Sequence, residues 1–420
     1  VVPRSWPRRW RQLVGALVVS VVATVATAPL VAWSFGRVAL LAPVANLAAD
    51  PLMALAQPLL FLAMAVPVPA AERLMSDASH ALLRGFHAVA MAIASVPGAA
   101  PAVAPTTAGA FAAGIVSVAI LVACVARRPT PWILLALGGV AAMVYEPLLP
   151  VRGDATELHM LDVGQGDAIA IRTRAGHWIL IDAGRAWRGG DAGRSVVVPY
   201  VSHRGGDVAL FVISHPHADH VGGAASVLRA LRPSRLLDPG YAGSTPSYHD
   251  ALDAAHERQM PWQRVRPGDS LVVDEVVLTA LAPDSAWASG LQDANLASTV
   301  LIVNAGGVRV LLTGDAEGPE EEWLLTHAAT LGADVLKVGH HGSRTSTTPA
   351  FLAAVHPRLA LVSVGAHNAY GHPDAEVMDA LRSAGATVLR TDQSGTIVLR
   401  LANGLIDVET RDARWTMGRR

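Results

Sequence analysis

The sequence contains a single cysteine, Cys124, in 420 residues, and that cysteine lies in an apolar run. An intrachain disulfide is therefore excluded, and cysteine usage does not indicate the redox compartment. Lysine is just as scarce, because Lys337 is the only lysine among 33 basic residues. The chain has no internal repeat and no low-complexity tract beyond alanine-rich helices. Its length is therefore filled by two or three ordinary domains.

A strong net charge is also lacking, since the formal value is −1. The distribution is nevertheless uneven: residues 1–150 hold nine arginines against four acidic residues, and the rest holds 24 basic against 30 acidic residues. A net acidic second part argues against a broad DNA-gripping surface there. The chain begins without an initiator methionine, so we expect it to be part of a longer protein, and its early arginines only imitate a signal peptide.

Charge-poor stretches dominate residues 1–150. They are residues 13–33, 38–70, 78–96, 106–126 and 131–149. The first and fourth are long enough, at about 20 residues, for spanning helices. Pro43, Pro51, Pro58 and Pro67 interrupt residues 38–70, which predicts broken or re-entrant helices rather than one continuous helix. Residues 78–96 carry two histidines and an arginine, which suits an interior or interfacial helix.

The arginines predict the orientation of this part. If the cluster at residues 4–11 is cytoplasmic, five crossings return Arg127 and Arg128 to the cytoplasm and leave residue 150 outside. If residues 78–96 do not cross, the two arginine clusters fall on opposite sides. A buried helical soluble domain is the alternative, and the length of the charge-free runs argues against it. We therefore expect a multi-pass domain in contact with membrane lipid, followed by an extracytoplasmic domain.

The most informative stretch runs from Ser214 to Gly223, with the sequence SHPHADHVGG. Three imidazoles and a carboxylate fall within six residues, directly after a strand-like apolar run. A strand that ends in a tight loop points successive side chains in different directions. His215 and His217 could then face one ion while Asp219 and His220 face a second. These donors suit zinc or a similar divalent metal; a polar surface loop is the alternative.

Further metal-ligating residue types follow two later strands. Asp315 comes after the apolar run 308–312, where it either caps the next helix or joins the metal ligands. His340 and His341 come after the strand-like segment 335–338. One of these two is expected to bind the second ion, and the sequence does not decide which, because a shift of one residue changes the face presented.

Several polar residues are candidates for supporting roles. Asp162 and Asp182 could orient the histidines from behind, or stabilise turns. Lys337 could bind a phosphate, and His372 could donate to a phosphate or act as leaving-group acid. Two residues of the loop after the histidines could hold a backbone phosphate. They are Ser343 and Arg344.

The sequence predicts a soluble α+β domain over residues 151–412 and a tail over residues 413–420. Its strands come in consecutive groups, as at residues 157–181 and 299–312, rather than in strict alternation with helices. Two sheets covered by helices would accommodate them all.

Taken together, these pieces resemble known families. The segment His215 to His220 resembles the HxHxDH signature of the metallo-β-lactamase superfamily, whose fold is an αββα sandwich. The soluble part resembles the hydrolase domain of ComEC-type DNA-uptake proteins in LDVGQGDA at 161–168 and in the segments 214–223, 311–315, 334–343, 370–373 and 391–395. The segments 28–30, 35–36, 42–47 and 50–52 resemble the end of the competence membrane domain of that family.

The resemblance implies a metal-dependent nuclease in the membrane. Asp315 would bridge two divalent ions, zinc or manganese. One DNA strand would pass inward through the membrane domain, with other competence-machinery proteins, while Asp219 and its neighbours serve degradation of the other strand outside. Two divalent ions can activate water and neutralise the charge of a phosphoryl transition state. The alternatives are a membrane-tethered hydrolase of small phosphoesters or lactams, and a metal site that only stiffens the fold.

One departure from the superfamily pattern bears on the metal. The usual further histidine ligand before the bridging aspartate is missing, since His249 and His256 lie on a polar helix-like segment. Asn295 stands at the corresponding place, so the first ion would have His215, His217, Asp315 and solvent, aided by Asn295. A site richer in oxygen favours manganese over zinc.

Overall fold

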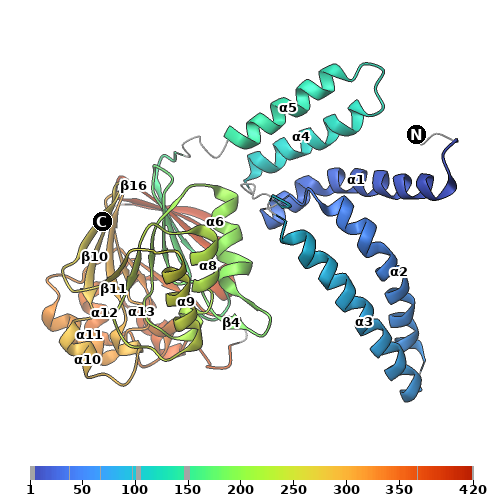
Figure 1. Cartoon of the computed structure of the whole chain (residues 1–420). Coiled ribbons are helices and arrows are strands. Elements are labelled where there is room, and N and C mark those ends of the chain that lie inside the picture. The colour runs from blue at the N-terminus through green and yellow to red at the C-terminus, as the bar shows by residue number, and fades with distance from the viewer. Residues whose placement is uncertain are drawn as a thin grey trace. The chain divides into compact units, whose positions relative to one another are not determined.

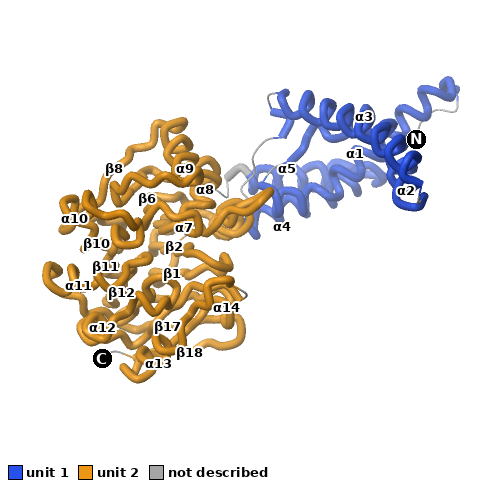
Figure 2. Tube along the Cα trace, turned by 90° about the horizontal axis from the view of Figure 1, so that it is seen from below, with its two compact units in different colours: residues 1–149 blue, residues 150–420 orange. Residues whose placement is uncertain are grey.

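The structure is a computed structural model. It describes residues 5–36, 38–66, 68–96, 98–100, 106–145, 152–366 and 368–418. The chain divides into two compact units, residues 1–149 and residues 150–420 (Figure 2).

The first unit is helical (Figure 1). Its helices are α1 Arg8–Phe35, α2 Ala42–Ala65, α3 Pro69–Ala94, α4 Thr107–Ala123 and α5 Thr130–Tyr145. Helix α2 packs against α3, α4 packs against α5, and α1 contacts both α2 and α4. Among the described residues, α1 and α2 are long and apolar enough to cross a membrane, whereas α4 and α5 are apolar but shorter.

Helix α2 differs from the prediction of broken or re-entrant helices, because residues 42–65 form one continuous helix. Pro43 lies in the first turn, where the missing N–H would have no helical partner anyway. Pro51 and Pro58 lie inside the helix, and each removes one backbone hydrogen bond. The helix packs along α3, and tertiary packing, rather than local propensity, supplies most of the stability of a helix in a folded protein. The fourth proline, Pro67, lies outside the described residues.

The second unit contains two large sheets. The nine-stranded sheet has the order β18-β17-β16-β1-β2-β3-β6-β7-β8, and the seven-stranded sheet has the order β15-β14-β13-β12-β11-β10-β9. The first comprises β1 Thr156–Met160, β2 Ile169–Arg172, β3 Trp178–Ile181, β6 Val208–Val212, β7 Leu236–Asp238, β8 Trp262–Arg264, β16 Ile397–Ala402, β17 Leu405–Glu409 and β18 Arg414–Met417. The second comprises β9 Ser270–Val273, β10 Val276–Ala282, β11 Val300–Ala305, β12 Val308–Leu312, β13 Val335–Lys337, β14 Leu359–Val362 and β15 Thr387–Arg390. Strands β4 Ala186–Trp187 and β5 Gly190–Asp191 form a separate hairpin.

Helices and short turns connect the strands. They are η2 Gly193–Val197, α6 Val198–Arg204, α7 Ala218–Val221, α8 Ala224–Leu231, α9 Pro246–Glu257, α10 Ser285–Ser289, η3 Asn295–Ala297, α11 Gly318–His327, η4 Gly339–Gly342, α12 Pro349–Val355, α13 Ala375–Ser383 and α14 Thr391–Ser394.

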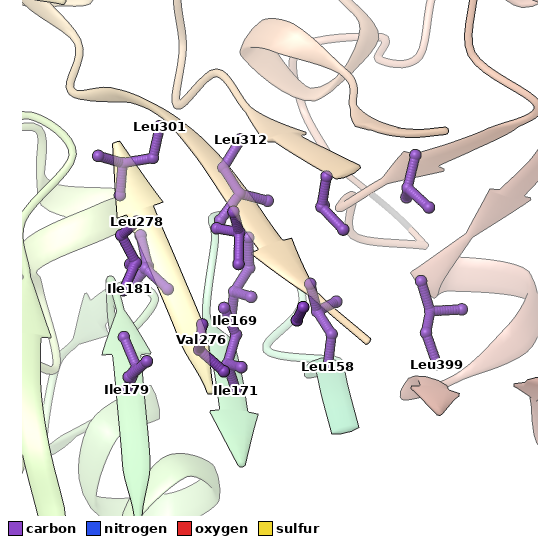
Figure 3. Close-up of a cluster of buried hydrophobic side chains, with 14 of the residues drawn as sticks. Leu158, Ile169, Ile171, Ile179, Ile181, Val276, Leu278, Leu301, Leu312 and Leu399 are labelled. Atoms are coloured by element: carbon purple, nitrogen blue, oxygen red, sulfur yellow. The ribbon is translucent and has the colours of Figure 1, made fainter. Parts of the chain in front are cut away.

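Three apolar clusters show how the layers stack. The central cluster joins the inner faces of the two sheets, with Ile179 of β3 and Leu312 of β12 among its members (Figure 3). A second cluster packs α8 and α9 on the outer face of the nine-stranded sheet, and there Leu180 points the opposite way from Ile179. A third packs α12 and α13 on the seven-stranded sheet. The predicted αββα sandwich is confirmed.

Residues 414–417 form β18, which pairs antiparallel with β17 so that Trp415 lies opposite Val408. The prediction of a tail from residue 413 is therefore wrong for these residues. The segment alternates exposed and half-buried side chains, and Trp415 packs against the central cluster. A single partly buried tryptophan between polar residues is a weak strand signal, which is why the sequence did not predict it.

Candidate metal centre

The parallel strands of both sheets bring the candidate ligands to one end of the sandwich. Strands β3 and β6 are parallel neighbours, as are β12, β13 and β14. Polar segments follow the carboxyl ends of these strands. The ends of the two sheets are joined where the Thr299 N–H donates to the Ser214 carbonyl at 2.7 Å. Loops that are far apart in the sequence therefore meet at one place.

Four side chains converge there, and we call them the four-ligand group: Asp219, His220, Asp315 and His341. One ligand atom from each lies within 4.8 Å of the others. The Nε2 atoms of His220 and His341 are 3.3 Å apart, and they lie 3.2 and 3.4 Å from Asp315 Oδ2. Asp219 Oδ2 is 3.3 Å from His341 Nε2. Two imidazoles and two carboxylates facing one point are a donor set that fits a divalent ion.

Buried partners fix the orientation of both imidazoles. His220 Nδ1 lies 2.8 Å from Asp182 Oδ2, and Asp182 also accepts from the Ser214 hydroxyl and N–H at 2.6 and 2.8 Å. His341 Nδ1 lies 2.9 Å from the Ser363 carbonyl. Each ring therefore presents Nε2 to the centre, as is typical of metal-binding histidines. Asp182 lies where the sequence analysis expected an orienting carboxylate.

The geometry distinguishes between the two histidines that the sequence left open. His341 is buried, whereas the His340 side chain is 25% exposed. His340 Nε2 is 4.0 Å from Asp315 Oδ2, and its Nδ1 is paired with Glu317 Oε1 at 2.9 Å. Both residues have left-handed backbone angles in the tight turn η4, so successive side chains diverge. This arrangement favours His341 as the ligand, and Glu317 is a partner that sequence reasoning missed.

His215 and His217, which we call the histidine pair, lie next to the four-ligand group. Their ring centroids are 4.8 Å apart, and the His215 ring is 4.2 Å from that of His220. His215 is fully buried, and its Nε2 has no hydrogen-bond partner among the described residues. That atom is 3.9 Å from Asp315 Oδ2. A buried nitrogen without a partner is costly, and an ion between His215 and Asp315 would remove that cost.

Asn295 is buried and linked to the same loops. Its amide nitrogen donates to Glu317 Oε1 at 3.1 Å, which connects it to His340. Its Oδ1 has no partner in the described part of the chain. A role of Asn295 as an additional ligand stays a prediction.

Lys337 does not lie where a phosphate could reach it. It is fully buried, and its Nζ is 2.5 Å from Asp167 Oδ2, 2.6 Å from the Gly314 carbonyl and 3.5 Å from Asp315 Oδ1. The predicted phosphate contact is thus contradicted, since the ammonium holds two carboxylates in place from behind. Asp167 was missed as a site residue, although it belongs to the LDVGQGDA segment.

Asp167 also forms a group with Asp182 and His220 that could hold a cation. The Lys337 ammonium already supplies the positive charge beside Asp167, and Asp182 is bound to His220 Nδ1. A second divalent ion in this group would therefore compete with a buried lysine. We assign the group a supporting role behind the four-ligand group.

The remaining predicted residues lie around the site. Asp162 accepts from the Gly164 N–H at 3.2 Å, so it stabilises a turn and does not orient a histidine. Ser343 Oγ is 2.9 Å from Thr345 Oγ1.

Arg344 is exposed and paired with Asp374 at 3.1 Å. The His372 ring is 5.5 Å from that of His340 and stacks on Tyr370. Phosphate-binding roles for Ser343, Arg344 and His372 stay predictions.

The electrostatics of the site match a place for a cation. Burial alone would lower the pKa of His220, but Asp315 and Asp182 raise it well above its ordinary value. In the same way Asp315 outweighs burial and raises the pKa of His341 to about 9. Burial and the neighbouring His220 lower the pKa of His215. The ionised carboxylates therefore hold protons on two imidazoles, and a divalent ion would replace those protons.

Two family models match the chain. The model of the metallo-β-lactamase superfamily matches residues 161–367, and the model of the competence protein family matches residues 1–129.

Three curated relatives are similar to this chain in sequence, and in each case the match covers only part of the relative. ComE operon protein 3 of Bacillus subtilis (strain 168) is 33% identical over 289 residues, which cover 64% of this chain and 36% of that protein. Recombination protein 2 of Haemophilus influenzae is 33% identical over 254 residues, covering 60% of this chain and 30% of that protein. Competence protein ComA of Neisseria gonorrhoeae is 31% identical, covering 65% and 36%. The chain thus spans about a third of the length of these relatives.

Proposed function

Because this chain joins a competence-protein region to a metallo-β-lactamase-superfamily domain, we propose that it forms the hydrolase-bearing part of a membrane DNA-uptake protein. The proposed reaction is metal-dependent hydrolysis of DNA phosphodiesters in the second unit. The observation that carries this proposal is the four-ligand group, which gathers two imidazoles and two carboxylates at one point. The names of the relatives supply the link to competence and recombination.

The residues present fit two divalent ions that share Asp315. The four-ligand group would hold one ion, and His215, His217 and Asp315 would hold the other, with Asp315 Oδ2 lying between the two sets. Ions bound there would supply Lewis-acid activation of water and of the phosphate.

The protein's own residues would orient the metal ligands, balance their charge and carry protons at the edge of the site. Asp182 and the Ser363 carbonyl fix the imidazoles. Lys337 holds Asp315 in place and balances its charge. His372, which is half-buried beside His340, has a pKa lowered by burial and by the neighbouring histidines. It can therefore be neutral near pH 7 and accept or return a proton at the edge of the site.

The first unit would carry one DNA strand across the membrane, and the second unit would degrade the other strand outside. The two long apolar helices support membrane association, and the asymmetry of the arginines supports a cytoplasmic start. A cysteine placed at exposed Ser289, in a variant with Cys124 replaced, tests the orientation in intact cells. Labelling by an impermeant reagent before lysis is expected; labelling only after lysis would refute this topology.

The hydrolase proposal is tested on the full chain, purified in detergent, stripped of metal and reloaded with manganese or zinc. We expect the reloaded protein to cut single- or double-stranded DNA, and a chelator to stop the reaction. If the reloaded protein leaves both kinds of DNA intact but hydrolyses a small phosphoester or a lactam, the nuclease proposal is wrong and the small-substrate alternative is correct.

A further inference from the structure

A cleft opens beside the histidine pair, and the roles described above leave it without a ligand. It has a volume of 370 Å³ and runs from His217 along residues 241–245 to residues 292–294. The first of these segments follows β7, and the second precedes η3. Because His217 belongs to the histidine pair and also lines this cleft, a molecule bound at the metal centre would lie beside the cleft.

The walls of the cleft are held in place by short contacts. The Thr245 hydroxyl donates to the Pro216 carbonyl at 2.7 Å. Gly243 packs so closely that a Cβ there would lie 2.3 Å from Pro216 Cβ, so no larger residue fits without a shift. At the base of the loop, buried Asp238 accepts from the Gly240 N–H at 2.6 Å and from the Tyr248 hydroxyl at 2.7 Å. The cleft is therefore formed before any ligand binds.

The lining determines which part of a substrate fits. Among the described residues, those that line the cleft include no lysine and no arginine, and Asp293 contributes a carboxylate. A phosphate group would be repelled by that carboxylate, because no lysine or arginine of the lining balances the negative charge. Tyr241 contributes an aromatic side chain to the lining, while Ser244 and Gln292 contribute a hydroxyl and an amide. An aromatic ring with neutral hydrogen-bonding groups and a carboxylate suits a nucleobase, which stacks on rings and donates N–H groups, ring or exocyclic, to carboxylates.

We propose that this cleft is a nucleobase subsite, which receives the base next to the phosphodiester held at the metal centre. The inference rests on the proposed function, because the ligand at the metals is taken to be DNA. Stacking on Tyr241 supplies affinity without strong sequence preference, since every base has a π-face. The net acidic second unit then binds DNA by a base at this cleft and by phosphate at the metal centre.

The test compares two fluorescent oligomers of equal length and charge, one of thymidine and one made only of abasic residues. Binding is measured by anisotropy on the full chain in detergent with manganese, in an Asp219→Ala background that prevents cutting. Tyr241→Ala should weaken binding of the thymidine oligomer about tenfold, the scale of one stacked base, and leave the abasic oligomer unchanged. Tyr241→Phe keeps the ring and should retain most of the affinity.

Two further variants keep the result interpretable. Gln292→Ala removes an exposed side chain of the same cleft, so folding is safe, and should weaken only the thymidine oligomer. Trp262→Ala removes an aromatic residue that is 57% exposed and outside the cleft, and should change neither. Equal loss of both oligomers in Tyr241→Ala, no loss of either, or no preference of the parent for bases would overturn the subsite. Failure of the proposed function is separate: it shows as an absence of DNA cutting by the metal-loaded wild type.

Discussion

The two halves of the metal centre differ in how firmly the protein holds them. In the four-ligand group, His220 and His341 each have Nδ1 against a buried oxygen, at 2.8 and 2.9 Å. In the histidine pair, His215 Nδ1 lies 3.0 Å from the Ser214 hydroxyl, a group that already donates to Asp182, and His217 is half-exposed. Oriented ligands bind metals more tightly. We therefore expect the four-ligand group to hold its ion more tightly than the histidine pair.

The largest effect is expected where a ligand faces both the ion and solvent. Asp219→Ala should lower the rate of DNA hydrolysis by at least about a thousandfold, because it removes a charge and a ligand from a two-metal centre, each worth several kcal/mol of barrier. The rate is measured on the metal-loaded full chain, with thermal unfolding as the folding control. If the variant keeps most of the activity, the reaction takes place elsewhere. If the wild type has no activity and the variant only loses stability, the metal is purely structural.

The next comparison is between neighbouring histidines. His341→Ala should reduce the affinity of the tighter ion by at least about a hundredfold, beyond the loss seen for partners that only orient a ligand. His340→Ala is the matched control, since His340 is partly exposed and pairs with Glu317; it should change that affinity about tenfold or less. Manganese titration of the stripped protein measures both. The reverse order of effects would show that His340 is the ligand.

Much of this centre follows from local sequence. The spacing in the segment 214–220 predicts ligands because a strand ending in a tight loop is a local event, and the structure brings Asp219 and His220 together with Asp315. The choice between His340 and His341 depends on two left-handed residues in one turn, which the sequence does not specify. That these side chains bind ions stays a prediction.

Roles that depend on packing between distant segments were not predictable in the same way. The only lysine among the basic residues suggested a phosphate ligand. In the structure Lys337 is an internal counter-ion of Asp167, and this contact could not be predicted because the two residues are far apart in the chain. Helix α2 is continuous despite its internal prolines, and it packs against α1 and α3, contacts that its own sequence does not reveal. The layered fold of the second unit and its match to the model of the metallo-β-lactamase superfamily were, in contrast, predicted correctly.

A smaller effect should separate the carboxylates that orient from those that stabilise turns. Asp182→Asn keeps the shape of the side chain but removes the charge beside His220 Nδ1, so we expect about a 10- to 100-fold loss of metal affinity. Asp162→Asn is the control, because Asp162 caps a turn through the Gly164 N–H, and metal affinity should stay unchanged. Equal losses in both variants would mean that orientation of His220 is not what distinguishes the four-ligand group.

The smallest effect concerns Glu320, which lies behind Asp315, the residue common to both halves. Its Oε2 accepts from the Ser298 N–H at 3.3 Å, and the Ser298 hydroxyl accepts from the Asp315 N–H at 3.1 Å. Burial, with a smaller contribution from Glu321, raises the pKa of Glu320 well above its ordinary value. A raised pKa in the folded state means that this group's contribution to stability is present below the unfolded pKa and is lost as pH rises through the folded pKa.

Glu320→Gln cannot ionise, so its melting temperature relative to wild type should rise between pH 5 and pH 8. Each kcal/mol corresponds to about 2–4 °C for a domain of this size, so we expect a shift of a few degrees, followed by tryptophan fluorescence. Glu322→Gln, on the exposed side of the same helix, is the matched control and should shift equally at both pH values. A Glu320→Gln difference that stays constant from pH 5 to pH 8 would mean that Glu320 keeps the same charge across that range, and that it does not contribute to the pH dependence of the framework behind Asp315.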